Sequence, residues 1–205
     1  DVYGRLLVKG TTEANVVLRG DRLDRMFSYL PYDRVSGQWA GLRIYEHSYG
    51  NEFENMDLHG AFDGLLVDSS DVTKQKLIMK AITIHNCQGF GLMADNSQVV
   101  LQNCQISNTQ NDCVRINGGK VTLTHCTLAQ FYPFSSNRGA ALWIAFNSSS
   151  TASVAVQNCL ITGYANDVLM MGKEEKDKGL VMTFCDSRIR TPRLEEPYAN
   201  AKFDN

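Results

Sequence analysis

Apolar and polar residues alternate along this chain in recurring blocks of eight positions. The clearest block reads VVLQNCQI over residues 99–106, and similar blocks read VTLTHCTL over 121–128 and VAVQNCLI over 154–161. Weaker copies begin at residues 51, 77 and 182. The third, sixth and eighth positions are apolar or nearly so, whereas the second and seventh are mostly polar or small. This alternation predicts strands that bury one face.

The alternation slips between the third and sixth positions, where two inward residues stand three apart. A strand can accommodate this only by bending, so the pattern predicts a corner at the fifth position. Asn and Asp are the non-glycine residues that best tolerate the left-handed conformation of a one-residue corner. The fifth position is held by Asn55, Ala81, Asn103, His125, Asn158 and Asp186.

A second, shorter block follows each of the first five at a nearly fixed distance. It reads GLLV over 64–67, GLMA over 91–94, CVRI over 113–116, ALWI over 141–144 and VLMM over 168–171, and GLRI over 41–44 precedes the set. Each turn of the chain therefore offers three short strands separated by tight corners. Because the smallest step between turns is 22 residues, with variable excess, the sequence predicts a solenoid with regular strands and variable loops.

On these blocks and corners, the chain resembles the right-handed parallel β-helix proteins of the pectate-lyase-like superfold over roughly residues 37–190. The opening stretch GRLLVKGTTEANVVLRGD, followed by QWAGLRIYEHS, is similar to the first coils of secreted bacterial β-helix proteins, many of them surface lipoproteins. The fold prediction is an all-β, single-stranded right-handed parallel β-helix of about seven to eight coils. We expect one domain over 1–205 with loop insertions at 21–37 and 130–139, belonging to a longer protein with flanking domains.

Composition excludes several partners. A net charge of −2 and a pI near 6.1 provide no basic field for nucleic acid. No run approaches the ~18 apolar residues of a transmembrane segment.

The six cysteines include Cys104, Cys126 and Cys159, which share the sixth position and predict a ladder of buried free thiols. There is no CxxC motif, and the histidines at 47, 59, 85 and 125 are not spaced as ligands on one face of the predicted strands. The sequence therefore predicts no metal site and no cofactor.

One segment carries a hint of catalysis. Residues 108–126 resemble the region of polygalacturonase-type glycosidases in which an Asp pair precedes Cys-Val, but the pair here is Asn111-Asp112. The Gly-His-Gly that follows in that family is replaced by residues 137–139, Asn-Arg-Gly. The resemblance leaves Asp112, Arg115 and Arg138 as weak catalytic candidates.

Inverting glycosidases need two carboxylates across the scissile bond. The repeat register places no second acid at that column on the neighbouring coils, and the nearest candidates are Asp63 and Asp167. Alternatively, Asn111-Asp112 and Asn166-Asp167 are corner residues that lead into a strand.

The third residue of the shorter block points outward, and four of its six occupants are large and apolar. This outer column comprises Arg43, Leu66, Met93, Arg115, Trp143 and Met170. The insertion QFYPFSSNRG over 130–139 adds Phe131, Tyr132 and Phe134 directly before Trp143. Either a loop or another domain covers the column, or it forms a docking face for a protein or glycan built around Trp143, Tyr132 and Arg115, with Phe134, Met93 and Leu66 contributing.

The aromatic residues of the first insertion, Phe27, Tyr29 and Tyr32, either pack down on the outer wall or line a glycan groove.

The sequence is compatible with two functions. One is a non-catalytic envelope module that binds a polysaccharide or an envelope protein, and the other is a hydrolase or lyase acting on acidic glycans. The sequence favours the binding module, since only Asp112, Arg115 and Arg138 offer themselves for catalysis. The resemblance to surface lipoproteins implies an extracytoplasmic location, anchored to the outer membrane of a bacterium or periplasmic.

Overall fold

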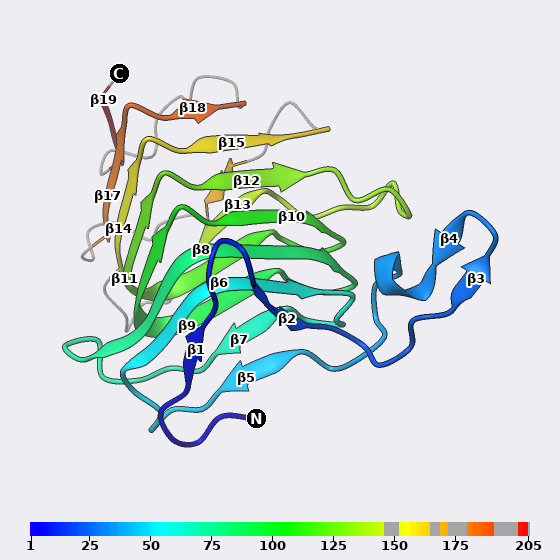
Figure 1. The fold of residues 1–205 in the computed structure, drawn as a ribbon. Helices are drawn as coiled ribbons and strands as arrows, with labels where there is room; N and C mark the ends of the chain where they lie inside the picture. Colours follow the sequence, from blue (N-terminus) through cyan, green and yellow to red (C-terminus); the bar gives the residue numbers. More distant parts are fainter. Residues whose placement is uncertain (146–151, 165–168, 172–179, 191–200, 205) are drawn as a thin grey trace.

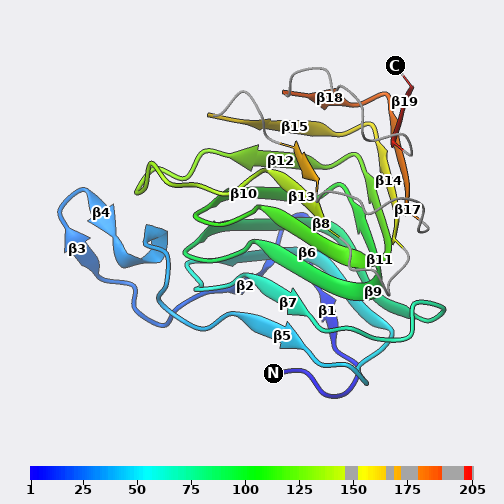
Figure 2. The ribbon, with the colours of Figure 1, turned by 180° about the vertical axis from the view of Figure 1, so that it is seen from behind.

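The computed structural model describes residues 1–145, 152–164, 169–171, 180–190 and 201–204. The chain winds into a parallel β-solenoid of about five turns, with three strands in a complete turn (Figure 1). Seen from behind, the strands of successive turns lie one above another from β5 to β18 (Figure 2). Among the described residues no helix is long and apolar enough to cross a bilayer.

Three faces run the length of the solenoid. The first contains β5 (Leu42–Ile44), β7 (Leu65–Val67), the beginnings of β9 (Leu92–Gln102) and β11 (Val114–Thr124), β13 (Leu142–Ala145) and β16 (Leu169–Met171). The second contains β1 (Leu7–Lys9), the beginnings of β6 (Asn51–His59) and β8 (Gln75–Cys87), the ends of β9 and β11, β14 (Ala152–Gln157), β17 (Leu180–Cys185) and β19 (Ala201–Asp204). The third contains β2 (Val16–Leu18), the ends of β6 and β8, β10 (Gln105–Thr109), β12 (Thr127–Gln130), β15 (Leu160–Gly163) and β18 (Arg188–Ile189).

The predicted corners are confirmed at every block. All six fifth-position residues have a positive φ, between 48° at Asn55 and 54° at His125. The structure adds further positive-φ corners that the sequence analysis did not identify, at Asn86, Asn96 and Asn108. The one-residue bends thus turn a single chain into three faces.

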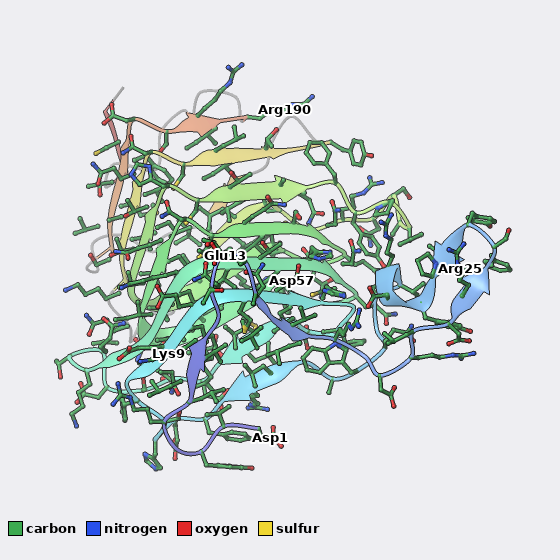
Figure 3. All side chains as sticks on the ribbon, in the orientation of Figure 1. Asp1, Lys9, Glu13, Arg25, Asp57 and Arg190 are labelled. Atoms are coloured by element: carbon green, nitrogen blue, oxygen red, sulfur yellow. The ribbon has the colours of Figure 1, made fainter. Side chains whose placement is uncertain are left out.

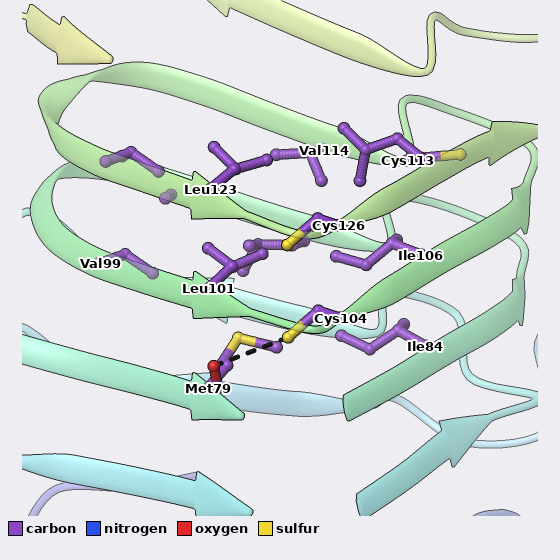
Figure 4. Packing of buried hydrophobic residues seen from close by; sticks show 14 of the residues in the cluster. Met79, Ile84, Val99, Leu101, Cys104, Ile106, Cys113, Val114, Leu123 and Cys126 are labelled. Carbon is purple, nitrogen blue, oxygen red and sulfur yellow. Dashed lines mark hydrogen bonds between the residues drawn. The ribbon is translucent and has the colours of Figure 1, made fainter. Parts of the chain in front are cut away.

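The inward ladders are also confirmed. Parallel register stacks the third-position residues Phe53, Met79, Leu101, Leu123, Val156 and Phe184, and all six are buried. Cys104 and Cys126 lie on successive coils inside the solenoid (Figure 4), and Cys159 Sγ accepts a hydrogen bond from Cys126 N at 3.3 Å. These thiols are free. The prediction of a buried thiol ladder is correct.

The predicted number of seven to eight coils is slightly higher than the about five turns of the solenoid. Among the described residues the second face stacks eight strands and the third seven, but the first stacks only six, so the coils at the two ends are incomplete. Residues 21–37 form an antiparallel hairpin of β3 (Arg25–Phe27) and β4 (Leu30–Pro31), followed by the short 3-10 turn η1 (Tyr32–Arg34). Figure 1 shows this hairpin projecting away from the stacked coils.

Of the two alternatives for the aromatic residues of this insertion, packing on the outer wall is wrong for two of the three. Phe27 and Tyr29 are 53% and 79% exposed, and their rings stack on each other with centroids 5.6 Å apart. Tyr32 lies under the guanidinium of Arg22, at 3.7 Å from its carbon to the ring centroid. The aromatic residues of this insertion therefore contact each other or Arg22 instead of packing against the wall of the solenoid.

Candidate functional site

A hollow of about 320 Å³ opens on the outer wall beside the 130–139 insertion. It lies between the first face, which supplies Arg115 and Trp143, and the corner that precedes that face. Its walls are formed by Phe90, Gln110, Asn111, Asp112, Arg115, Asn137, Arg138, Gly139 and Trp143. The three weak catalytic candidates and the central tryptophan of the predicted docking face thus meet at one place.

The outer column predicted from the sequence exists in register. Arg43 pairs with Leu66, Leu66 with Met93, Met93 with Arg115, Arg115 with Trp143 and Trp143 with Met170. Leu66, Met93 and Trp143 are each half-buried. The side chain of Met170 lies outside the described part of the chain. Leu66 and Met93 belong to the column but not to the hollow.

Arg115 is the centre of the site. Its guanidinium carbon lies 4.9 Å from the centroid of the Trp143 ring and 5.7 Å from that of Phe90. Its Nε donates to Asn117 Oδ1 at 3.2 Å, and Asn117 Nδ2 donates to Asp95 Oδ1 at 2.6 Å. The rings and this hydrogen-bonded chain hold the guanidinium in place. The indole N–H of Trp143 is buried and has no hydrogen-bond partner among the described residues.

Asp112 is a corner residue whose carboxylate has structural partners. Its Oδ1 accepts the N–H of Ala140 at 2.7 Å, and its Oδ2 accepts from Arg115 Nη1 at 3.2 Å. Only 4% of the residue is exposed. Burial raises the pKa of Asp112, and the Ala140 N–H and the Arg115 charge offset this only in part.

Asp63 performs the same task at the equivalent corner of an earlier coil. Its Oδ1 accepts the N–H of Phe90, one coil further on, at 2.8 Å, just as Asp112 accepts Ala140. Asp63 does not line the hollow. The alternative that Asn111-Asp112 is a corner pair therefore accounts for the carboxylate. Asn166 and Asp167 lie outside the described residues.

Arg138 supports the insertion and also faces the hollow. Its Nε donates to the carbonyl oxygen of Tyr132 at 2.5 Å, and its guanidinium carbon lies 4.6 Å from the ring centroid of Tyr164. Tyr132, expected at the docking face, is instead 4% exposed and shares a hydrogen bond of 2.7 Å between its hydroxyl and Ser36 Oγ. Phe134 is 56% exposed but does not line the hollow.

A family model described as the right-handed β-helix region matches residues 33–178. The chain belongs to this family. Searches of curated proteins and of solved structures found no match for this β-helix protein. The predicted fold class is thereby confirmed, together with the hand of the winding.

The hollow of this β-helix protein is suited to binding an anion. Two guanidinium groups face it, and the one carboxylate among the described lining residues is buried and engaged by Arg115 and a backbone N–H. Guanidinium groups form bidentate hydrogen bonds with carboxylates and sulfates, and they stack on aromatic faces.

Sequence reasoning missed Phe90, Gln110 and Asn117. Phe90 occupies the same corner position as Asp63 and Asp112, directly before the shorter block, and alignment of that position would have found it.

The expectation about the histidines was wrong. His59 on β6 pairs directly with His85 on β8, and their rings stack with centroids 4.8 Å apart. Asp57, two residues before His59, lies on the same outward face, and its Oδ1 is 2.5 Å from His59 Nδ1 and 3.4 Å from His85 Nε2. Both histidines follow directly after an eight-residue block, outside its inward columns, and parallel register brings them together on the outward face.

Hydrogen bonding within the cluster shifts the pKa values of Asp57 and His59. Burial pushes the pKa of Asp57 upward, but the hydrogen bonds from His59 and His85 outweigh it and hold that pKa well below its usual range. The hydrogen bond to Asp57 raises the pKa of His59 against the opposing effect of burial, and Asp33 reinforces the rise. Asp33 comes from η1, so the first insertion closes over the cluster.

Proposed function

We propose that this β-helix protein is a non-catalytic binding module for carbohydrate, and that the hollow around Arg115 and Trp143 is its binding site. The ligand is a glycan that carries carboxylate or sulfate groups. The half-buried column from Leu66 through Met93 extends the contact surface beside the hollow.

The placement of Arg115 carries this proposal. A guanidinium that lies against Trp143 and is fixed by Asn117 loses little side-chain entropy when it binds an anion. Arg138 brings a second positive charge to the same hollow. Two fixed cations beside an aromatic ring match a sugar ring that bears an acidic group.

The state of Asp112 argues against hydrolysis. A general acid or base must exchange a proton with the substrate, but both oxygens of Asp112 already accept hydrogen bonds from the protein. An inverting mechanism also needs a second carboxylate. No other acidic residue lines the hollow within the described part of the chain.

The decisive experiment is binding to defined polysaccharides. We expect retardation in affinity gels containing polygalacturonate or alginate and none in gels containing neutral dextran. Arg115→Gln and Trp143→Ala should abolish the retardation while circular dichroism and urea unfolding show a folded protein. Arg43→Gln is the matched control, because Arg43 occupies the same outer column but lies outside the hollow. Retention that survives Arg115→Gln would contradict the proposal.

Catalysis is tested on the same substrates. Reducing-sugar and unsaturated-product assays should show no turnover by the wild type. Turnover that is lost in Asp112→Asn would replace the binding module by a carbohydrate-active enzyme.

We also propose an extracytoplasmic location at a bacterial envelope, with a polysaccharide or an envelope protein as partner. The similarity of the opening coils to those of surface lipoproteins supports this location. An antibody against the β-helix protein should label intact or osmotically shocked cells of the source bacterium. Labelling only after complete lysis would contradict it.

A further inference from the structure

The cluster on the third face brings three metal-ligating side chains together. Alternation along β6 places Asp57 and His59 on one face, and parallel register sets His85 beside His59. One carboxylate oxygen and two imidazole nitrogens from these residues all lie within 4.8 Å of one another. Figure 3 labels Asp57 on this wall of the solenoid.

We propose that Asp57, His59 and His85 form a binding site for a divalent transition-metal ion of the zinc class. This inference goes beyond the proposed glycan function and uses a different set of residues. Two imidazoles and one carboxylate form the ligand set of open zinc sites, in which water takes the remaining position.

The distances are close to those that a metal requires. Metal–ligand bonds of about 2.0–2.1 Å in a tetrahedron place neighbouring ligand atoms about 3.3–3.4 Å apart. Asp57 Oδ1 and His85 Nε2 are already 3.4 Å apart. Asp57 Oδ1 and His59 Nδ1, now 2.5 Å apart, would separate by about 1 Å. The two imidazole nitrogens lie within 4.8 Å of each other, and the stacked rings would rotate to direct both lone pairs at one ion.

Asp33 supplies the outer support that such a site needs. Its Oδ1 lies 3.0 Å from His59 Nε2, and Arg19 Nη1 holds the same oxygen at 3.1 Å. When His59 Nε2–H donates to Asp33, the lone pair of Nδ1 points toward Asp57 and His85 and is available to a metal. A carboxylate behind a ligating histidine fixes its tautomer and orientation. Asp33 is therefore a positioning residue and not a ligand.

Accessibility is suited to an exchangeable ion. The side chain of His59 is 9% exposed, whereas those of Asp57 and His85 are each 27% exposed. An ion can therefore enter from solvent on the Asp57 and His85 side. Since Asp33 belongs to the 21–37 insertion, metal binding also strengthens the attachment of that insertion to the wall.

The first test measures metal content. Chelator-treated protein is dialysed against buffered Zn²⁺ and analysed for bound metal, and we expect one Zn²⁺ per chain. Ca²⁺ and Mg²⁺ should not compete, because imidazole ligands do not suit these hard cations. His85→Gln and Asp57→Asn should weaken binding about tenfold or more, and His47→Gln, at an exposed histidine outside the cluster, should leave it unchanged.

The second test holds even if a variant folds poorly. Co²⁺ added to the wild type should give the visible absorption of a site with nitrogen and oxygen ligands, without the near-ultraviolet band of thiolate ligation. Asp33→Asn should keep this spectrum at saturation while lowering Zn²⁺ affinity about 10- to 100-fold. Three results would each overturn the proposal: equal Zn²⁺ binding by His85→Gln, a thiolate absorption band, or no bound metal. The cluster would then be a set of ion pairs that joins the first insertion to the wall.

Discussion

The two insertions, 21–37 and 130–139, leave the solenoid at the same kind of corner but fold differently. One follows β2 and the other follows β12, and both strands belong to the third face. The 130–139 insertion folds back and walls the hollow, whereas the hairpin of the 21–37 insertion projects outward with Phe27 and Tyr29 exposed. They touch through the 2.7 Å hydrogen bond between Ser36 and Tyr132.

The difference lies in the side chains that each insertion meets on the wall. The second insertion is tied down close to the coil, since Ala140 N–H binds Asp112 and Gly139 N–H binds the carbonyl of Gln110. The first is held behind its hairpin, where Asp33 meets His59, Asn86 Nδ2 donates to the carbonyl oxygen of Arg34, and Gly37 N–H donates to that of Ala61. A loop of either kind becomes part of a site only where an outward polar residue of a neighbouring coil anchors it.

The largest effect is expected from Asp112→Ala. The change leaves the N–H of Ala140 without its acceptor and Arg115 without its carboxylate. We expect a loss of about 2–3 kcal/mol in the free energy of unfolding, measured by urea titration. Asp112→Asn keeps an acceptor for Ala140 and should lose clearly less. Equal losses would mean that Asp112 does not anchor the second insertion through this bond.

His59→Ala should loosen the first insertion, which the backbone contacts at Arg34 and Gly37 still hold. It removes the contacts to Asp57 and Asp33 and costs about 1–2 kcal/mol. Trypsin should then cleave at Arg22, Arg25 or Arg34 several times faster in the presence of a chelator. His47→Ala is the control, because that side chain is 86% exposed. An unchanged cleavage rate would show that other contacts hold the insertion.

Much of the fold could be predicted from the sequence because inward positions obey a strict rule. The corner at His125 and the stacked thiols of Cys104 and Cys126 follow from volume and backbone conformation, which every coil must satisfy. The outer column from Arg43 to Trp143 follows from the same register. The number of complete turns was overestimated because the repeat pattern counts the two end coils in full, whereas the described residues give each of them fewer than three strands.

The candidate sites depended on contacts that no repeat rule specifies. Tyr132 looked like a docking residue because it precedes Trp143 in sequence, yet it is buried by its bond to Ser36, 96 residues away in the chain. His59 and His85 each follow directly after an eight-residue block, at 51–58 and 77–84, so none of the block's columns includes them. Comparing outward positions of adjacent strands, as for inward ones, would have revealed the pair.

A smaller effect is expected at the contact between the insertions. Ser36→Ala and Tyr132→Phe each remove one side of a single hydrogen bond and keep the surrounding packing. A double-mutant cycle by urea unfolding should give a coupling of about 0.5–1 kcal/mol. If the coupling is zero, the two insertions are independent, and the hollow does not depend on the first of them.

The smallest effect is a pH dependence that separates the charge of Asp112 from its hydrogen bond. An unfolded Asp ionises near about pH 3.9, and burial raises the pKa of Asp112 in the folded state. Between these two values the folded protein binds more protons than the unfolded chain, so this residue's contribution to stability falls as pH rises. The free energy of unfolding of the wild type minus that of Asp112→Asn, from urea titrations between about pH 3.5 and 7, should therefore decline with rising pH and then level off above the folded pKa. A difference that rises with pH would mean that Arg115 outweighs burial, and the carboxylate would then serve the hollow as a stabilised charge.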